Sequence, residues 1–142
     1  MKSLVDVNVL FALLVEAHVH HPVAWDWWER QEDGAVVLCW PTRLGVLRLL
    51  TNSRAMAGSP VLPDEALAAW QTFADDSRTA WSDPISAHEV HFRGYVSGRQ
   101  PAPNLWTDAW LAAHAESMGI RLTSFDADFH SFGLADFEHL TA

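Results

Sequence analysis

A chain of 142 residues with 49% apolar and 19% charged side chains has the length and composition of about one globular domain, not of a disordered chain. Its 18 acidic side chains outnumber the 9 basic ones, and the formal charge of −9 argues against a protein that binds nucleic acid through a broad basic face. This charge remains compatible with an enzyme that binds phosphate groups through a bound cation, because the ion reverses the local charge. A basic protein partner also fits this charge.

The first predicted element is a short buried strand at residues 2–5, followed directly by Asp6 and a helix-forming run. Asn8 is predicted to cap that helix, because asparagine accepts well from free N–H groups at a helix start. Asp6 then lies in a strand-to-helix turn, where open parallel sheets bind their ligands. The alternative is that Asp6 only helps to cap the helix.

The middle of the chain is predicted to contain one more buried strand, at residues 35–39, and mostly helices around it. His18, His20 and His21 are expected to form a helix entry and not a metal site, because no second His or Cys cluster completes them. The predicted helices run from Pro22 to about Arg30, from Arg43 to about Leu50, from Asp64 onward and from Ile85 to about Val96, with loops at 51–63 and 75–84.

A helix that ends at Gly119 carries the first functional signal of the second half, and Asn104 is predicted to cap its start by accepting a free N–H group. Asp108 lies on its apolar face, because the residues three, four and seven positions further on are apolar. A carboxylate there is expensive to bury without a partner. The alternative is that Asp108 caps or pairs locally.

A β-prone run at residues 121–124 follows this helix, and Asp126 and Asp128 come directly after it. A solvated turn would also explain these two acids. Residues Asp136–Leu140 are predicted to form a short edge strand.

The alternation of strands and helices predicts a three-layer α/β/α sandwich with a central, mainly parallel sheet, formed by residues 1–142 as a single domain. In that architecture Asp6 and Asp126 follow strand ends at one edge of the sheet, and Asp108 arrives there from a helix. Converging carboxylates repel one another unless a cation lies between them. Hard oxygen ligands of this kind suit Mg²⁺ or Mn²⁺.

Four separate stretches resemble the PIN-domain family, and within it the VapC-type toxins of toxin–antitoxin systems. In chain order they read LVDVNVL, GVLRLLTN, NLWTDAWLAAHA and LTSFDADF, and they span nearly the whole chain. The resemblance implies a metal-dependent endoribonuclease that cleaves RNA phosphodiester bonds with Mg²⁺ or Mn²⁺. It also implies inhibition by a cognate VapB-like antitoxin and a homodimer.

The resemblance assigns the catalytic and metal-holding roles to Asp6, Asp108 and Asp126. Arg48 is interpreted either as a phosphate contact or as a partner in a structural salt bridge. The residues expected beside the site or against the substrate are Asn8, Arg48, Thr107 and Asp128.

Gly45 departs from the family pattern, which usually has a glutamate three residues before the arginine that Arg48 matches. A glycine inside a helix costs roughly 1 kcal/mol relative to alanine, so the position needs a reason, such as close backbone packing. The missing carboxylate leaves open whether one or two metal ions bind. If the helical register is right, a glutamate at position 45 would face the acids.

Two other functions are considered. An Asp-based phosphatase or a receiver domain would need a lysine late in the chain to pair with phosphate, but Lys2 is the only lysine. A catalytically impaired PIN-like module that binds a protein partner is favoured by Gly45 alone.

A reducing compartment is predicted, because the single cysteine, Cys39, can form no disulfide within the chain. The sequence shows no signal peptide and no apolar run of membrane length. We therefore expect a cytoplasmic protein without a membrane contact.

Overall fold

The computed structural model describes residues 1–141, and its five strands form one parallel sheet in the order β3-β2-β1-β4-β5. The chain adds strands outward from β1 on one side and then crosses to add β4 and β5 on the other. The crossover places the topological switch point between β1 and β4, where open α/β sheets bind ligands. The strands are β1 (Ser3–Val5), β2 (Val36–Leu38), β3 (Thr79–Trp81), β4 (Arg121–Ser124) and β5 (Phe137–His139).

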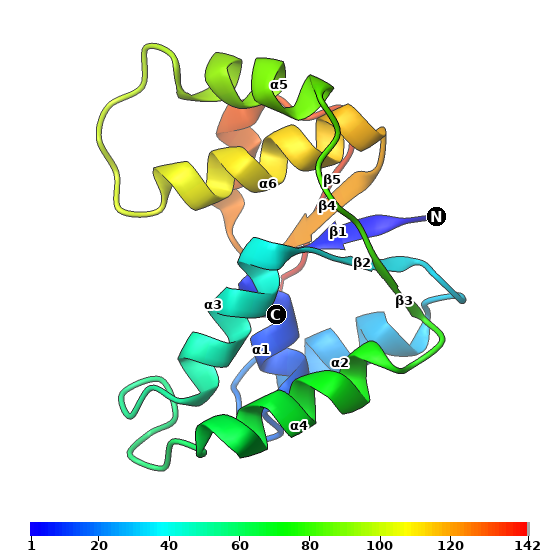
Figure 1. Cartoon of the computed structure of the whole chain (residues 1–142), viewed down its shortest axis with the longest axis vertical. Helices are drawn as coiled ribbons and strands as arrows, with labels where there is room; N and C mark the ends of the chain where they lie inside the picture. Colours follow the sequence, from blue (N-terminus) through cyan, green and yellow to red (C-terminus); the bar gives the residue numbers. More distant parts are fainter. Residues whose placement is uncertain (142) are drawn as a thin grey trace.

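Helices cover both faces of the sheet, which confirms the predicted three-layer α/β/α sandwich (Figure 1). The helices α5, α6 and η1 lie on one face, and the helices α1 to α4 lie on the other. The helices are α1 (Val7–Leu14), α2 (His21–Glu29), α3 (Trp40–Leu50), α4 (Pro63–Ala74), α5 (Ala87–Val96), α6 (Leu105–Met118) and the 3-10 helix η1 (Ala127–Phe132).

The alternation of side chains along β1 builds a separate hydrophobic core on each face. Leu4 packs with Leu111 of α6, whereas Val5 packs with Val9 of α1 and Trp28 of α2, and all five side chains are buried. Successive residues of a strand point to opposite faces, so a short apolar run supplies both layers. The buried strand β1 ends at Val5, and Asp6 follows it directly.

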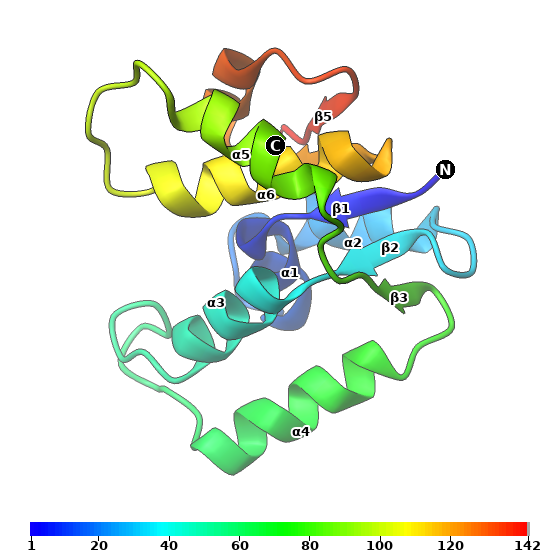
Figure 2. The ribbon, with the colours of Figure 1, turned by 45° about the horizontal axis from the view of Figure 1, so that its top comes forward.

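The carboxyl ends of the parallel strands meet at one edge of the sheet (Figure 2). The loop from α5 to α6 and the loop from α3 to α4 both extend on that side of the molecule. The segments that could cover a site at the switch point are therefore gathered beside it. None of the helices formed by residues 1–141 has the length and apolar character needed to cross a membrane.

The predicted loop at residues 75–84 was wrong, because it contains the edge strand β3. Its three residues are half-buried or exposed, so the sequence carries no apolar run there. Helix α3 begins at Trp40 and not at Arg43, because Pro41 fits the first turn of a helix. Helix α4 begins at Pro63, with Leu62 at its N-cap, so Asp64 lies within the first turn.

The predicted capping roles of two asparagines were also wrong. Asp6, and not Asn8, caps α1 by accepting a hydrogen bond from the Val7 N–H at 2.7 Å. Asn104 occupies the N-cap position of α6, but its side chain makes no capping hydrogen bond. Its backbone, at φ −104° and ψ 6°, lies outside the extended region that brings a capping side chain back to the helix.

Gly45 lies where α3 approaches α1, and its lack of a side chain has a steric reason. A Cβ atom at position 45 would lie 2.6 Å from Cγ2 and 3.2 Å from Cγ1 of Val7. The first distance is below any ordinary contact, so a side chain there requires Val7 to move. The structure therefore supports close packing as the reason for this glycine.

Gly45→Ala is expected to destabilise the protein, because overpacking costs about 1–3 kcal/mol and exceeds the helix-propensity gain of up to ~1 kcal/mol. Gly94→Ala on α5 is the matched control, because a Cβ there meets nothing within 4 Å. That variant should be more stable than wild type. Urea denaturation measures both changes. Val7→Ala should remove most of the penalty of Gly45→Ala, and equal stabilisation by both alanines would contradict the steric explanation.

Candidate active site

Asp6 lies directly after the central strand β1 and is held by β4 as well as by its own helix. Its N–H donates to the Thr123 carbonyl at 3.0 Å, and its Oδ2 accepts from the Ser124 hydroxyl at 2.7 Å. The residue is only 8% exposed, and burial raises the pKa of its carboxyl group above the ordinary value. The hydrogen bonds from Ser124 and Val7 act in the opposite direction.

Ser124, the last residue of β4, joins three of the polar residues at the switch point. Besides donating to Asp6, its Oγ accepts from Asn8 Nδ2 at 3.1 Å and from the Asp126 N–H at 2.9 Å. Asn8 Oδ1 accepts from the Phe125 N–H at 3.2 Å. Asn8 therefore ties α1 to the end of β4. Ser124 was missed in the sequence, although its place immediately before the acidic turn was a usable signal.

Asp108 enters the site from the first turn of α6 and is half-buried. Its pKa is raised from 3.8 to about 7, mainly by burial and then by the negative charges of Asp6, Asp126 and Asp128. The three acids predicted to converge line one pocket, which places their negative charges near one another. Asp126 caps η1, since its Oδ1 accepts from the Asp128 N–H at 2.9 Å.

One pocket of about 480 Å³ collects most of the predicted residues. Its lining includes all three acids proposed to be catalytic, and Asp128 lies outside it in an adjoining hollow. The predicted residues that line the pocket are Asp6, Asn8, Arg48, Thr107, Asp108 and Asp126. The sequence analysis missed the contributions of Phe11, His18, Leu49 and Asn52.

His18 has a defined orientation at this pocket. Its Nδ1 accepts from the His20 N–H at 3.0 Å, and its ring packs against Phe11 at a centroid distance of 5.5 Å. Burial, followed by the nearby His20 and His21, lowers the pKa of His18. A neutral imidazole with its Nδ1 occupied carries its proton on Nε2. The histidine segment does lead into a helix as predicted, but α2 begins at His21, one residue before the predicted start at Pro22.

Arg48 is exposed and takes part in none of the ion pairs formed among residues 1–141. The alternative of a structural salt bridge is therefore not supported. A cationic side chain at the rim of an acidic pocket is free to contact a phosphate group.

The donor chemistry of the pocket fits a divalent cation. Carboxylates are the ligands that Mg²⁺ and Mn²⁺ prefer, and none of the ion pairs among residues 1–141 joins Asp6, Asp108 or Asp126 to a cationic side chain. Within residues 1–141, no group of three His, Cys, Asp or Glu side chains is placed so that it could hold a metal ion. The acids therefore fit the ion by ligand type and charge, and not by a preformed coordination geometry.

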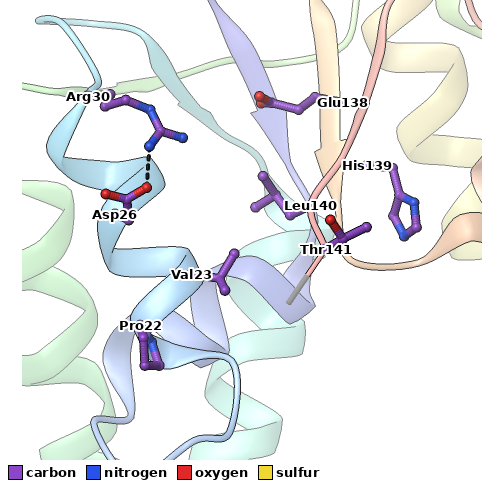
Figure 3. Close-up of a pocket in the computed structure, with 8 residues that line it drawn as sticks. All are labelled: Pro22, Val23, Asp26, Arg30, Glu138, His139, Leu140 and Thr141. Carbon is purple, nitrogen blue, oxygen red and sulfur yellow. Dashed lines mark hydrogen bonds and ion pairs between the residues drawn. The ribbon is translucent and has the colours of Figure 1, made fainter.

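A separate pocket of about 440 Å³, away from the acids, lies between α2 and β5 and contains none of the predicted residues (Figure 3). Its charged side chains include Asp26 and Arg30, which pair with each other one helical turn apart and are exposed. The acid pocket is therefore the better candidate for chemistry.

Residues 3–134 match the PIN domain family. Ribonuclease VapC41 of Mycobacterium tuberculosis (strain CDC 1551 / Oshkosh) is 37% identical over 136 residues, which cover 92% of each chain. Ribonuclease VapC29 of the same strain is 33% identical over 127 residues, or 89% of this chain and 87% of that protein.

Solved structures share the fold at lower identity. The crystal structure of Mycobacterium tuberculosis VapC20, described as a sarcin-ricin loop cleaving toxin, matches with a TM-score of 0.69 and 20% identity over 95% of this chain and 98% of its own. The VapBC-1 structure from nontypeable Haemophilus influenzae matches with a TM-score of 0.67 and 17% identity over 98% of each chain.

A parallel sheet with carboxylates at its switch point, together with these matches, shows that the chain belongs to the PIN-domain family. Within that family, its relatives of 33–37% identity are VapC ribonucleases.

Asp108→Asn is expected to stabilise the metal-free protein at pH 8 more than at pH 5. Because the pKa of Asp108 rises from 3.8 to about 7 on folding, the folded state binds more protons between these values and loses stability as pH rises through them. Thermal melts in the presence of a chelator measure the effect. Asp64→Asn, at an exposed acid of α4, is the control and should shift both melts equally. An Asp108→Asn shift that is independent of pH would contradict the repulsion.

Proposed function

We propose that this chain is a toxic endoribonuclease of the VapC type, which hydrolyses RNA phosphodiester bonds with Mg²⁺ or Mn²⁺. The observation that carries the proposal is the convergence of Asp6, Asp108 and Asp126 on one pocket in a chain that is 37% identical to Ribonuclease VapC41. These acids would be the catalytic and metal-holding residues. The ion, when bound, would lower the pKa of a water molecule and orient the phosphate.

The other residues of the pocket position the acids and the substrate. Ser124 donates a hydrogen bond to Asp6, and Asn8 in turn donates one to Ser124, as residues behind metal ligands commonly do. Before the ion binds, burial and the neighbouring acids raise the pKa of Asp108 to about 7, so binding of the ion would displace any proton that this carboxyl group holds. Arg48 offers an unpaired cation to a phosphate oxygen, and Thr107 offers a hydroxyl group at the rim.

The rival function, a protein-binding module without nuclease activity, depended on Gly45. The close approach of Val7 gives this glycine a packing reason that does not involve loss of activity. The acids needed for catalysis are present around it. The nuclease is therefore the better-supported function.

A cognate VapB-like antitoxin is the proposed partner of the toxin. Structures that share the fold include VapBC-1 from Haemophilus influenzae and VapBC2 from Rickettsia felis bound to a DNA fragment from their promoter. The net charge of −9 suits a basic segment of the antitoxin, and exposed aromatic side chains such as Trp25 and Trp106 suit its apolar contacts. A homodimer, a single domain over residues 1–142 and a cytoplasmic location complete the proposal.

RNA cleavage is expected to stop in a chelator and to return with Mg²⁺ or Mn²⁺. Asp6→Asn, Asp108→Asn and Asp126→Asn should each lower the rate by about 100-fold or more, since even residues behind metal ligands contribute about 10–100-fold. Asn caps a helix as well as Asp does, so Asp6→Asn should remain folded.

A fluorophore–quencher RNA measures these rates, with Asp26→Asn, an exposed acid of α2, as the control that should cut like wild type. Wild-type rates in all three pocket variants would reject the assignment of the acids. Cleavage that persists in the chelator would reject the metal.

Expression of the chain alone is expected to arrest growth, and co-expression of the neighbouring small open reading frame should restore it. The arrest should disappear in Asp6→Asn and persist in Asp26→Asn, because only the first change touches the pocket. Plating efficiency after induction measures both. Normal growth without a partner, combined with no cleavage by the purified protein, would favour the binding-module function.

A further inference from the structure

A second hollow of about 500 Å³ adjoins the acid pocket on the other side of Asp108. The two share Pro103, Asn104 and Asp108 in their linings. Each has the size of an ordinary small-ligand site. A chain-like ligand whose reacting bond lies at Asp108 could therefore occupy both.

Arg99 lines this hollow and is held in one orientation by the residues of η1. Its Nη1 donates to Ser131 Oγ and its Nη2 to the Ser131 carbonyl, both at 2.9 Å. Its guanidinium carbon lies 4.1 Å from the centroid of the Phe132 ring. These contacts use two of the five guanidinium N–H donors, so the others remain available in a fixed direction.

Arg99 differs from most of the other arginines because it forms no ion pair with a carboxylate in residues 1–141. Four of the eight arginines form ion pairs with carboxylates, namely Arg30, Arg78, Arg93 and Arg121. Arg99 and Arg48 form none within the part of the chain that the structure describes, residues 1–141. Arg48 lines the acid pocket and Arg99 the adjoining hollow, so unneutralised cations flank Asp108 on both sides.

We infer that the adjoining hollow is a second subsite for RNA, in which Arg99 binds the phosphate next to the one that is cut. The inference rests on the proposed nuclease function, because it places the scissile phosphate at Asp108. A fixed guanidinium group recognises a phosphate by charge and by paired N–H donors. Arg99 thus sets the register of the RNA strand across the site and is a binding residue, not a catalytic one.

The test combines a change in the protein with a change in the substrate. The substrates are one short single-stranded RNA and two copies in which the phosphate on the 5′ or on the 3′ side of the cut is a neutral methylphosphonate. Wild type should show about tenfold higher KM for one of the two copies, with kcat nearly unchanged, as expected for loss of one charged hydrogen-bonded contact. Arg99→Ala should show that tenfold loss on normal RNA and no further loss on the same copy.

Salt dependence gives a second readout. The slope of log kcat/KM against log salt concentration should be smaller by about 0.7 in Arg99→Ala, since one phosphate contact to a single strand is lost. Arg93→Ala is the matched control, because that arginine is exposed, pairs with Glu89 on α5 and lines neither pocket. Arg99→Lys keeps the charge, so it should retain the slope and lose part of the affinity. If Arg99→Ala fails to fold, the wild-type response to the two copies and Arg99→Lys decide the matter.

The outcomes separate this inference from the proposed function. Absence of cleavage by wild type with every RNA and divalent cation would reject the nuclease itself. Cleavage by wild type that is unaffected by either methylphosphonate and by Arg99→Ala would overturn the second subsite alone. A loss of antitoxin affinity in Arg99→Ala, with RNA cleavage unchanged, would assign the hollow to the protein partner and would also overturn it.

Discussion

The arrangement of the site depends on the hydrogen bonds made by the hydroxyl group of Ser124. It donates to Asp6 at the end of β1, accepts from Asn8 in α1 and accepts from the N–H of Asp126 after β4. The two strands it joins are neighbours only because the chain crosses over the sheet at the switch point. Without this hydroxyl the buried Asp6 carboxylate would lose a donor that offsets its desolvation, and the turns on both sides would lose their common partner.

Burying the acids costs free energy, and the contacts of the fold do not fully offset this cost. Burial raises the pKa of Asp6 and Asp108, and the pocket offers them hydrogen bonds but no paired cationic side chain. This cost to local stability would be offset by a bound positive ion under the proposed function, as is common at functional sites. Arg48 and Arg99 line the two pockets, where they would attract phosphate without neutralising the acids. In this way a chain that is acidic overall would still select an anionic polymer.

The sequence was sufficient for the layers, the parallel sheet and the acids, because long apolar periodicities and strand-end positions carry that information. It was insufficient for β3, whose three half-exposed residues leave no pattern. It assigned the cap of α1 to Asn8, because Asp and Asn cap equally well and only the approach of β4 shows that Asn8 bonds across to Phe125. His18 and Arg99 could not be selected, since their roles come from a pocket lining and from partners distant in sequence. The position of Ser124 before the acidic turn was a usable signal, but its bond to Asp6, 118 positions away, is visible only in the fold.

The bond from Ser124 to Asp6 joins residues 118 positions apart. Because domains are synthesised from the N-terminus, a nascent chain that has exposed only its first 120 residues has the acids at positions 6 and 108 but lacks β4, the hydroxyl and Asp126. The central strand then has no neighbour on that side, and the pocket has no second wall. If the proposed nuclease function holds, an incomplete chain would therefore be unable to cut RNA, and activity would begin only when the last strands have emerged and paired.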